Sequence, residues 1–201
     1  MGRPREFDER QALEQAMQVF WTKGYDATSL CDLMQAMGLS KSSLYDTFGS
    51  KNDLFVRAIE HYCETVQARF LGELRARHKE LGSARAAIAG VFEVAVETAV
   101  ETGAGSEPQR GCFLGNCAVE IAGHDPAATA RVRAGMKATE NALYDVVKAG
   151  QDGGEIPAGR DARALARSLT SSLNGLRMMA KLEPKEAGLR DIARLAVSVM
   201  D

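Results

Sequence analysis

Residues 110–117, Arg-Gly-Cys-Phe-Leu-Gly-Asn-Cys, carry the side chains best suited to covalent chemistry. Cys112 is expected in the first turn of a short helix, directly after a Gly-rich loop. A helix N-terminus and a nearby arginine both favour the thiolate, which is the reactive form of cysteine. Cys117 lies on another side of the same helix, so a disulfide to Cys112 would require local unwinding. Cys112 is therefore a candidate sensor of oxidants or electrophiles, and the alternative is a small residue that only packs.

No other residue pattern indicates catalysis or metal binding. The four cysteines match no zinc motif, and sequence places no histidine or aspartate beside Cys112 to complete a nucleophile–base pair. The three histidines, which also lack the spacing of metal ligands, are His61, His78 and His124. We therefore expect no catalytic residue, no metal and no cofactor, with an enzyme that uses Cys112 as its nucleophile kept as an alternative.

Residues 28–48 follow the pattern of a helix-turn-helix. Apolar side chains between residues 30 and 37 recur at helical spacing, and Gly38 suits the left-handed end of a helix. Ser40 can cap a second helix that directs Leu44 and Phe48 inward. Such a motif places its second helix in the major groove of DNA.

The polar residues of this motif are the candidates for DNA contact. Thr28 is expected to cap the first helix, whose N-terminus can meet a phosphate. The second helix offers short or polar side chains to bases and phosphates, namely Lys41, Ser42, Ser43, Tyr45 and Thr47. Further positive charge lies at Lys51 and in an N-terminal arm with Arg3 and Arg5, which could enter the minor groove. The alternative for the arm is a solvated tail.

Bulk charge does not favour nucleic acid. The 201 residues carry a formal net charge of −2, and residues 1–52 hold six basic against seven acidic side chains. Any DNA affinity must come from a few well-placed, salt-sensitive contacts. The N-terminal residues lack the apolar stretch of a secretory signal, and no run is long enough to span a membrane. We expect a cytoplasmic protein with reduced cysteines and no membrane partner.

The remaining pattern predicts an all-α protein of about nine helices. Strand signals are almost absent, and one long helix over residues 51–81 is expected to connect two domains. These are a three-helix DNA-binding domain at residues 1–50 and a second helical domain at residues 51–201, to which the family resemblance given below assigns effector binding and dimerisation. The final helices are expected at residues 161–181 and 185–200, after loops at 103–111 and 150–159.

The last two helices carry apolar stripes that could meet a second copy of the chain. Pairing of two such helices across a two-fold axis gives a four-helix interface, and it would double the DNA contacts. Packing within one chain is the alternative. The residues predicted for the interface are Leu165, Leu169, Leu173, Leu176, Leu189, Ile192 and Leu195.

Residues 12–55 resemble the TetR/AcrR family of transcriptional regulators. The matching pieces are Phe-x3-Gly-Tyr-x2-Thr-Ser, the Gly-Leu-Ser turn, Leu-Tyr-x2-Phe and Ser-Lys-x2-Leu. The resemblance implies a homodimer on a pseudo-palindromic operator, an effector pocket in each C-terminal domain, and repression relieved by the effector. Matched residue by residue, it implies DNA contacts at Thr28, Lys41, Ser42, Ser43, Tyr45, Thr47 and Lys51. The string Gly-Cys-Phe-Leu-Gly-Asn also resembles the electrophile-sensing NemR-like branch, a likeness that extends only to Cys112.

The effector itself is less well defined by the sequence. A small apolar molecule is the main expectation, and thiol modification of Cys112 is the alternative. The pocket candidates, which combine apolar residues with Asn116 as the polar anchor, are Phe70, Phe92, Cys112, Asn116, Met136, Tyr144 and Met178. A ligand-responsive repressor is the predicted function; an activator and a helical dimer without DNA binding remain alternatives.

Overall fold

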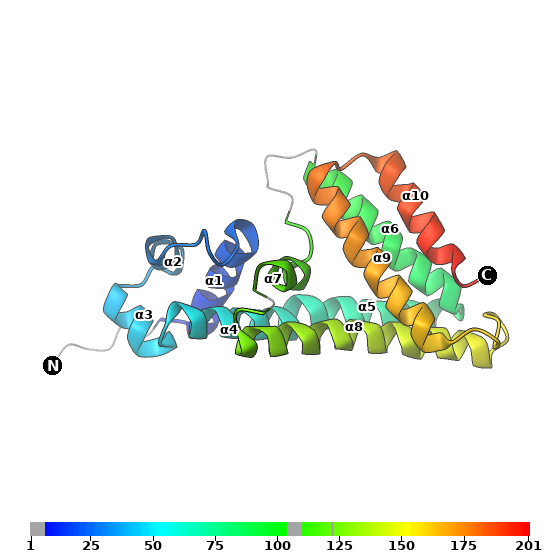
Figure 1. Cartoon of the computed structure of the whole chain (residues 1–201), viewed down its shortest axis with the longest axis horizontal. Coiled ribbons are helices and arrows are strands. Elements are labelled where there is room, and N and C mark those ends of the chain that lie inside the picture. Colours follow the sequence, from blue (N-terminus) through cyan, green and yellow to red (C-terminus); the bar gives the residue numbers. More distant parts are fainter. Residues whose placement is uncertain (1–6, 104–109, 122) are drawn as a thin grey trace.

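The computed structural model describes residues 7–103, 110–121 and 123–201, and these residues form helices joined by short connections (Figure 1). The elements are α1 (Glu9–Lys23), α2 (Leu30–Met37), α3 (Lys41–Phe48), α4 (Lys51–Tyr62), a π-helical turn (Cys63–Gln67), α5 (Ala68–Leu81), α6 (Ala84–Gly103), α7 (Phe113–Ile121), α8 (Pro126–Asp152), α9 (Ala162–Leu182) and α10 (Glu186–Ser198). The all-α prediction is confirmed. Because α4, the π turn and α5 are continuous, the described helices form nine rods.

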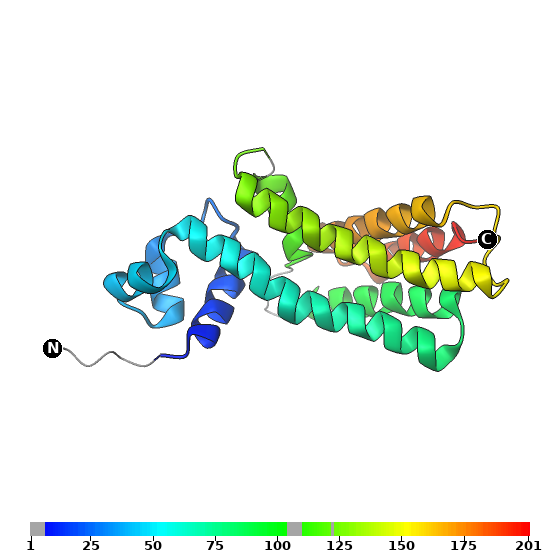
Figure 2. The same ribbon diagram turned by 90° about the horizontal axis from the view of Figure 1, so that it is seen from below.

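The N-terminal helices lie at one end of an elongated molecule. The rod made of α4, the π turn and α5, here called the linking helix (residues 51–81), leaves this end and runs the length of the protein (Figure 2). Helix α8 accompanies it, while α6, α9 and α10 form a layer across its far half (Figure 1). Short α7 lies between the two ends. The long helix expected over residues 51–81 is therefore present, and it extends from the N-terminal helices into the rest of the molecule.

Local capping explains where the first helices begin. The carboxylate of Asp8 accepts the backbone N–H groups of Arg10 and Gln11, and the hydroxyls of Ser40 and Ser50 accept N–H groups at the starts of α3 and α4. The cap of α2 is Ser29, which forms a reciprocal capping box with Asp32. The prediction that Thr28 caps α2 is therefore wrong by one residue.

The linking helix departs from the regular helix that its apolar spacing predicts. Residues Cys63–Gln67 form a π-helical turn, which accommodates one extra residue. The side chain of Gln67 is buried there, and its amide donates to the Gly135 carbonyl at 2.6 Å and to the Thr139 hydroxyl at 2.9 Å. The π turn thus directs a buried amide onto α8 and fixes the middle of the linking helix there.

Two hydrophobic cores lie along the molecule. The first joins α1, α2, α3 and α4 to α7 and the first turns of α8, and the second joins α5, α6, α9, α10 and the rest of α8. The first core therefore extends well beyond residue 50, through α4 to Val132 on α8. A domain boundary at residues 50/51 stays a prediction, and the packing couples the two sides of that boundary closely.

The leucine stripe of α9 and α10 faces inward. Leu165, Leu169, Leu173, Leu176 and Leu189 are buried within the single chain. Their prediction as interface residues is corrected, since the core of this chain covers them. Of the remaining two predicted residues, Ile192 is half-buried and Leu195 is 61% exposed.

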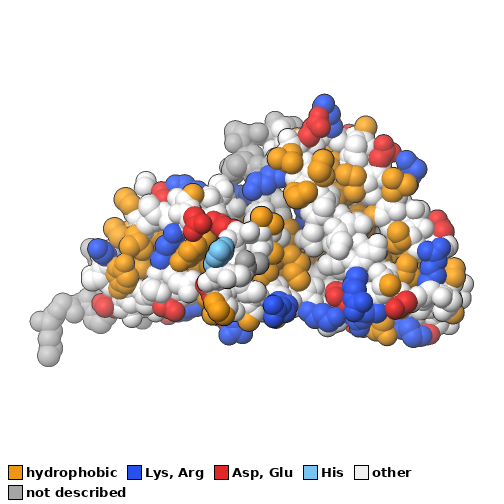
Figure 3. All heavy atoms as spheres, in the orientation of Figure 1, with side chains coloured by type: hydrophobic (Ala, Val, Ile, Leu, Met, Phe, Trp, Pro, Cys, Tyr) orange, Lys and Arg blue, Asp and Glu red, His pale blue; other side chains and the backbone are white. Residues whose placement is uncertain are grey.

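A different face of these helices is exposed. Its large apolar residues are Met178, Met179, Leu182 and Leu195. Figure 3 shows hydrophobic side chains gathered over α9 and α10, beside an uncharged area over the middle of α9. Helix α7 likewise has an exposed apolar residue, since Val119 is 89% exposed.

Candidate nucleic-acid interface and ligand pocket

Helix α3 presents a polar outer face at the end of the molecule. Leu44 and Phe48 are buried and anchor it to the first core, as the spacing predicts. Lys41, Ser42 and Tyr45 are exposed, with 41% of Tyr45 accessible. These side chains are free to meet a surface.

Serine hydroxyls organise the N-terminus of α3. The Ser40 hydroxyl lies 3.0 Å from that of Ser42 and 2.9 Å from that of Ser43, and it also accepts the Ser43 backbone N–H. Ser43 and Thr47 are half-buried. The first turn of α3 therefore combines unpaired helix N–H groups with hydroxyls and Lys41, an arrangement that suits a phosphate.

The other predicted DNA contacts have different surroundings. Thr28 is buried, and its hydroxyl donates to the Gly24 carbonyl at 2.5 Å, so its side chain is turned away from the surface. The Lys51 ammonium donates to the Tyr25 carbonyl at 2.6 Å and lies 4.3 Å from the Tyr25 ring centroid. Arg3 and Arg5 fall outside the described residues.

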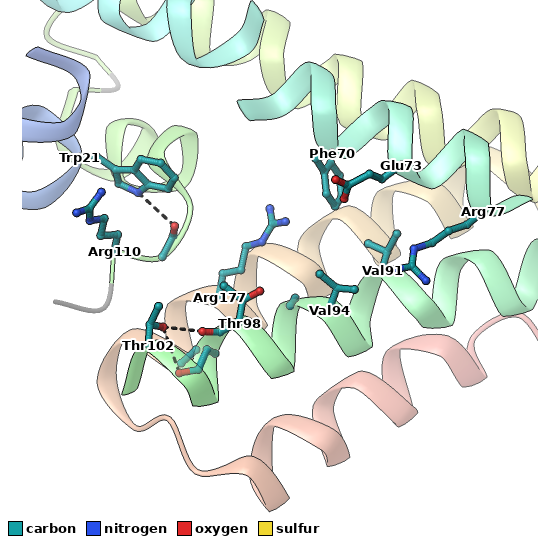
Figure 4. A pocket seen from close by; sticks show the side chains of 14 residues that line it. Trp21, Phe70, Glu73, Arg77, Val91, Val94, Thr98, Thr102, Arg110 and Arg177 are labelled. Atoms are coloured by element: carbon teal, nitrogen blue, oxygen red, sulfur yellow. Dashed lines mark hydrogen bonds between the residues drawn. The ribbon is translucent and has the colours of Figure 1, made fainter. Parts of the chain in front are cut away.

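A pocket of about 430 Å³ opens between α5, α6 and α9 and reaches α1 through Trp21 (Figure 4). Its wall is mainly apolar, with charged groups at several points. The lining residues are Trp21, Phe70, Glu73, Arg77, Val91, Val94, Ala95, Thr98, Ala99, Thr102, Arg110, Gly111, Arg177 and Ala180. The volume falls in the range that drug-sized ligands occupy.

A small cavity of about 50 Å³ adjoins this large pocket, and the two share Phe70 and Arg177. Of the predicted pocket residues, Phe70 lines both spaces, and Cys112 and Met136 line the small cavity. Asn116 does not act as a pocket anchor, because its amide donates to the Arg110 carbonyl at 2.8 Å and it lines neither space.

Three other predicted pocket residues lie elsewhere. Phe92 is fully buried in the second core, and the Tyr144 ring packs under the Arg163 guanidinium at 3.8 Å. Met178 is 57% exposed on the outer face of α9. Its neighbour Arg177 points into the large pocket instead (Figure 4). The signal for Arg177 was available, because it follows Leu173 by four residues on the apolar stripe.

Hydrogen bonds near both ends of α7 join it to the N-terminal helices. The Trp21 indole N–H donates to the Gly111 carbonyl at 3.2 Å. At the other end of α7, the Glu120 carboxylate accepts the backbone N–H groups of Tyr25 and Asp26 at 2.9 and 2.8 Å. Gly24, with φ of +83°, allows this approach, since a Cβ there would lie 3.0 Å from both carboxylate oxygens. Sequence reasoning missed Glu120, whose signal was an acid within an otherwise apolar helix.

The thiols differ in exposure and ionisation. Cys112 is buried beside the Tyr62 hydroxyl, and the Gly115 N–H points at its sulfur at 3.4 Å. The pKa of Cys63 is raised to about 11, mainly by burial and to a smaller extent by the nearby Cys112. Burial also raises the pKa of Cys117. Cys31 is the exposed thiol of the described set.

Other chemistry finds little support in the described ranges. His61 is buried with its Nε2 2.8 Å from the Glu14 carboxylate, so it is engaged away from Cys112. No group of three or more potential metal ligands occurs among the residues that the structure places. Within the same residues, no helix is both long and apolar enough to cross a bilayer.

Comparison with known proteins agrees with this geometry. Residues 12–58 match the family model of bacterial regulatory proteins of the tetR family, and residues 92–196 match a tetracyclin repressor-like C-terminal domain. The chain belongs to the TetR family. It is a DNA-binding transcriptional regulator with an N-terminal helix-turn-helix.

Individual TetR relatives cover most or all of the chain. The HTH-type regulator YezE of Bacillus subtilis is 35% identical over the full length of both proteins. The transcriptional repressor ComR of Escherichia coli is 34% identical over 90% of this chain and 82% of its own. A cysteine mutant of the TetR regulator CifR, solved with 26-bp double-strand operator DNA, is 28% identical with a TM-score of 0.84 over the full length of both chains. These relatives are regulators rather than enzymes.

Proposed function

We propose that this protein is a cytoplasmic homodimeric repressor that leaves a pseudo-palindromic operator when a small effector fills the large pocket. The observation that carries the proposal is the position of Trp21. It belongs to α1 of the DNA-binding end, yet it lines the pocket and hydrogen-bonds to the pocket residue Gly111. A ligand in the pocket therefore touches the DNA-binding end directly.

DNA binding relies on the outer face of α3 in two copies. Lys41, Ser42 and Tyr45 supply exposed contacts, with Ser43, Thr47 and Lys51 at the margin. A single face with so little net positive charge binds DNA weakly, and a dimer places two such faces on successive major grooves. The exposed apolar residues of α9 and α10 support dimerisation, because a large apolar patch on a surface marks a binding site.

Release follows from a change in the separation of the two α3 helices. The linking helix and α7 both connect the pocket to the DNA-binding end, through Phe70 on one side and Gly111 on the other. A ligand that binds better to one arrangement of these helices shifts the population toward it. The similarity to the repressor ComR supports repression as the mode of regulation, and activation is the alternative.

Thiol modification at Cys112 is the second candidate for the signal. Cys112 lines the small cavity beside the large pocket, so an adduct on its sulfur would press on Phe70 and Arg177. Its neighbours are the Tyr62 hydroxyl and the Gly115 N–H rather than an imidazole, which argues against a thiol enzyme. In a Cys112→Ser variant, release by electrophiles should be lost while operator binding persists.

Selection of bound sequences from a random duplex library tests the proposal. The full chain should enrich a sequence with two-fold symmetry, and a gel shift with that duplex should show one dimer per site. Reporter transcription from a promoter that contains the site should fall when the protein is present. Enrichment of no sequence would refute the regulator, and increased transcription would favour the activator.

A further inference from the structure

The guanidinium of Arg177 occupies the middle of the large pocket. It extends from α9 between Phe70 on one side and the Trp21 and Arg110 side on the other (Figure 4). Its central carbon lies 4.9 Å from the centroid of the Phe70 ring, which is the distance of a cation–π contact. The N–H groups along its edges remain directed into the pocket.

No acid of the described chain neutralises this arginine. Glu73, the acidic side chain of the lining, lies 3.7 Å from the Arg69 guanidinium outside the pocket. Among the residues that the structure places, Arg177 has no ion pair. A half-buried guanidinium whose planar edge is unused is suited to a bidentate carboxylate, and it loses part of its hydration in any case.

The other charged residues of the pocket wall also favour an anionic ligand. Arg77 and Arg177 bring two positive charges to this wall, against the single negative charge of Glu73. The surface between these groups is apolar, with Val91 and Ala95 on α6. A cationic ligand would meet this field unfavourably, and a neutral ligand would leave Arg177 without its counter-charge in a partly dry site.

We infer that the effector is an apolar carboxylate whose carboxyl group pairs with Arg177 and whose hydrocarbon body lies along α6. This inference names the ligand class of the regulator proposed above and rests on that proposal. The pair also explains how binding reaches the small cavity. A carboxylate that draws Arg177 off the Phe70 ring changes the wall shared with Cys112 and Tyr62.

Matched acids and alcohols test the charge requirement. Decanoate with decanol, and phenylbutyrate with phenylbutanol, are titrated into the full-length protein by calorimetry. At least one acid should bind about tenfold or more tightly than its alcohol, because a charge-assisted hydrogen bond is worth a factor of this size. Arg177→Gln should weaken that acid about 10- to 100-fold and change the alcohol little.

Arg163→Gln is the matched control. Arg163 lies on the same helix and also stacks on an aromatic ring, but it pairs with Glu140 and lines neither space. This variant should bind the acid as the parent does. Equal binding of acid and alcohol, no binding of any probe, or an Arg177→Gln variant with parental acid affinity would each overturn the inference.

Operator binding without ligand separates this inference from the regulator proposal. If the protein binds its selected duplex but binds each acid no more tightly than the matched alcohol, the ligand class is refuted and the regulator proposal is unaffected. A preparation that binds the acid through Arg177 but no DNA refutes the regulator and leaves the anion site. Release of DNA by the acid, lost in Arg177→Gln, supports both.

Discussion

The Trp21 indole N–H donates to the Gly111 carbonyl at 3.2 Å, across 90 residues of sequence. Trp21 is on the first helix of the DNA-binding end, and Gly111 leads into α7, so this bond joins the DNA-binding end to the pocket region. Arg110 and the Trp21 ring also lie 6.0 Å apart. The pocket is thus partly built from the DNA-binding end, which is the basis of the proposed coupling between ligand and DNA binding.

The contact at the far end of α7 gives the first prediction. Glu120→Ala removes the acceptor for the N–H groups of Tyr25 and Asp26, whose bonds to a charged group are worth about 1.5–3 kcal/mol. The amides of Tyr25 and Asp26 should then exchange hydrogen markedly faster, as measured by nuclear magnetic resonance. Glu97→Ala, at an exposed position of α6, is the control and should leave both rates unchanged.

A second prediction concerns α3. Lys41→Ala and Tyr45→Ala should weaken binding to the selected operator, and Lys41→Ala should also reduce the salt slope of the affinity by about one, since one phosphate contact is lost. Asp46→Ala removes a negative charge from the same exposed face and should not weaken binding. Fluorescence anisotropy at several salt concentrations measures all three. If either of the first two variants became monomeric, α3 would be part of the dimer interface instead.

The two faces of α9 and α10 should respond differently to mutation. Leu182→Glu and Leu195→Glu place a charge on the exposed face and should yield folded monomers in sedimentation experiments. Leu169→Ala, at a fully buried position, should lower the free energy of unfolding by about 2–5 kcal/mol through the cavity it leaves. A stable dimer in both glutamate variants would place the interface on other helices.

Gly135 allows α8 to approach its neighbours closely. A Cβ there would lie 2.6 Å from Leu114 Cδ1 and 3.1 Å from Cys63 Sγ, so Gly135→Ala should destabilise the protein by about 1–3 kcal/mol. Gly72 has open space around its missing Cβ, and Gly72→Ala should instead stabilise α5 by about 0.5–1 kcal/mol. Urea unfolding midpoints compare the two; equal shifts in one direction would contradict the packing at Gly135.

Alkylation should reveal the order of thiol reactivity. N-ethylmaleimide should modify exposed Cys31 first, as followed by mass spectrometry. Because the pKa of Cys63 is raised to about 11, its thiolate is scarce at neutral pH, and its labelling rate should rise about tenfold per pH unit until that value is approached. Fast labelling of Cys63 at pH 7 would show that this thiol is not held in a buried, protonated state.

Local signals in the sequence were sufficient for the helix-turn-helix. The Ser40 cap and the inward residues Leu44 and Phe48 depend on neighbours within a few positions, and these predictions agree with the structure. Such local signals do not show which helices pack against each other when they are distant in the sequence. Apolar spacing shows that α9 has a buried face, but not whether its own chain or a second copy covers it, so the sequence alone does not show that Leu169 packs within the chain.

The sequence also does not show which residues of a helix line the pocket. Adjacent residues on a helix point about 100° apart, so Arg177 lies inside the pocket while Met178 is on the outer surface. The prediction chose Met178 because it is apolar. The pocket joins α1, α5, α6 and α9, and only their packing shows that Trp21 and Arg177 share one space.

The π turn at residues 63–67 has a consequence for grafting the DNA-binding end of this protein onto the C-terminal domain of another regulator. One extra residue in the linking helix corresponds to about 100° of rotation and 1.5 Å of rise. A hybrid joined within this helix to a partner with a regular helix would turn α3 by that angle about the linking-helix axis. In the proposed dimer, the two α3 helices would then face away from successive grooves, so a working hybrid must exchange residues 51–81 as one piece.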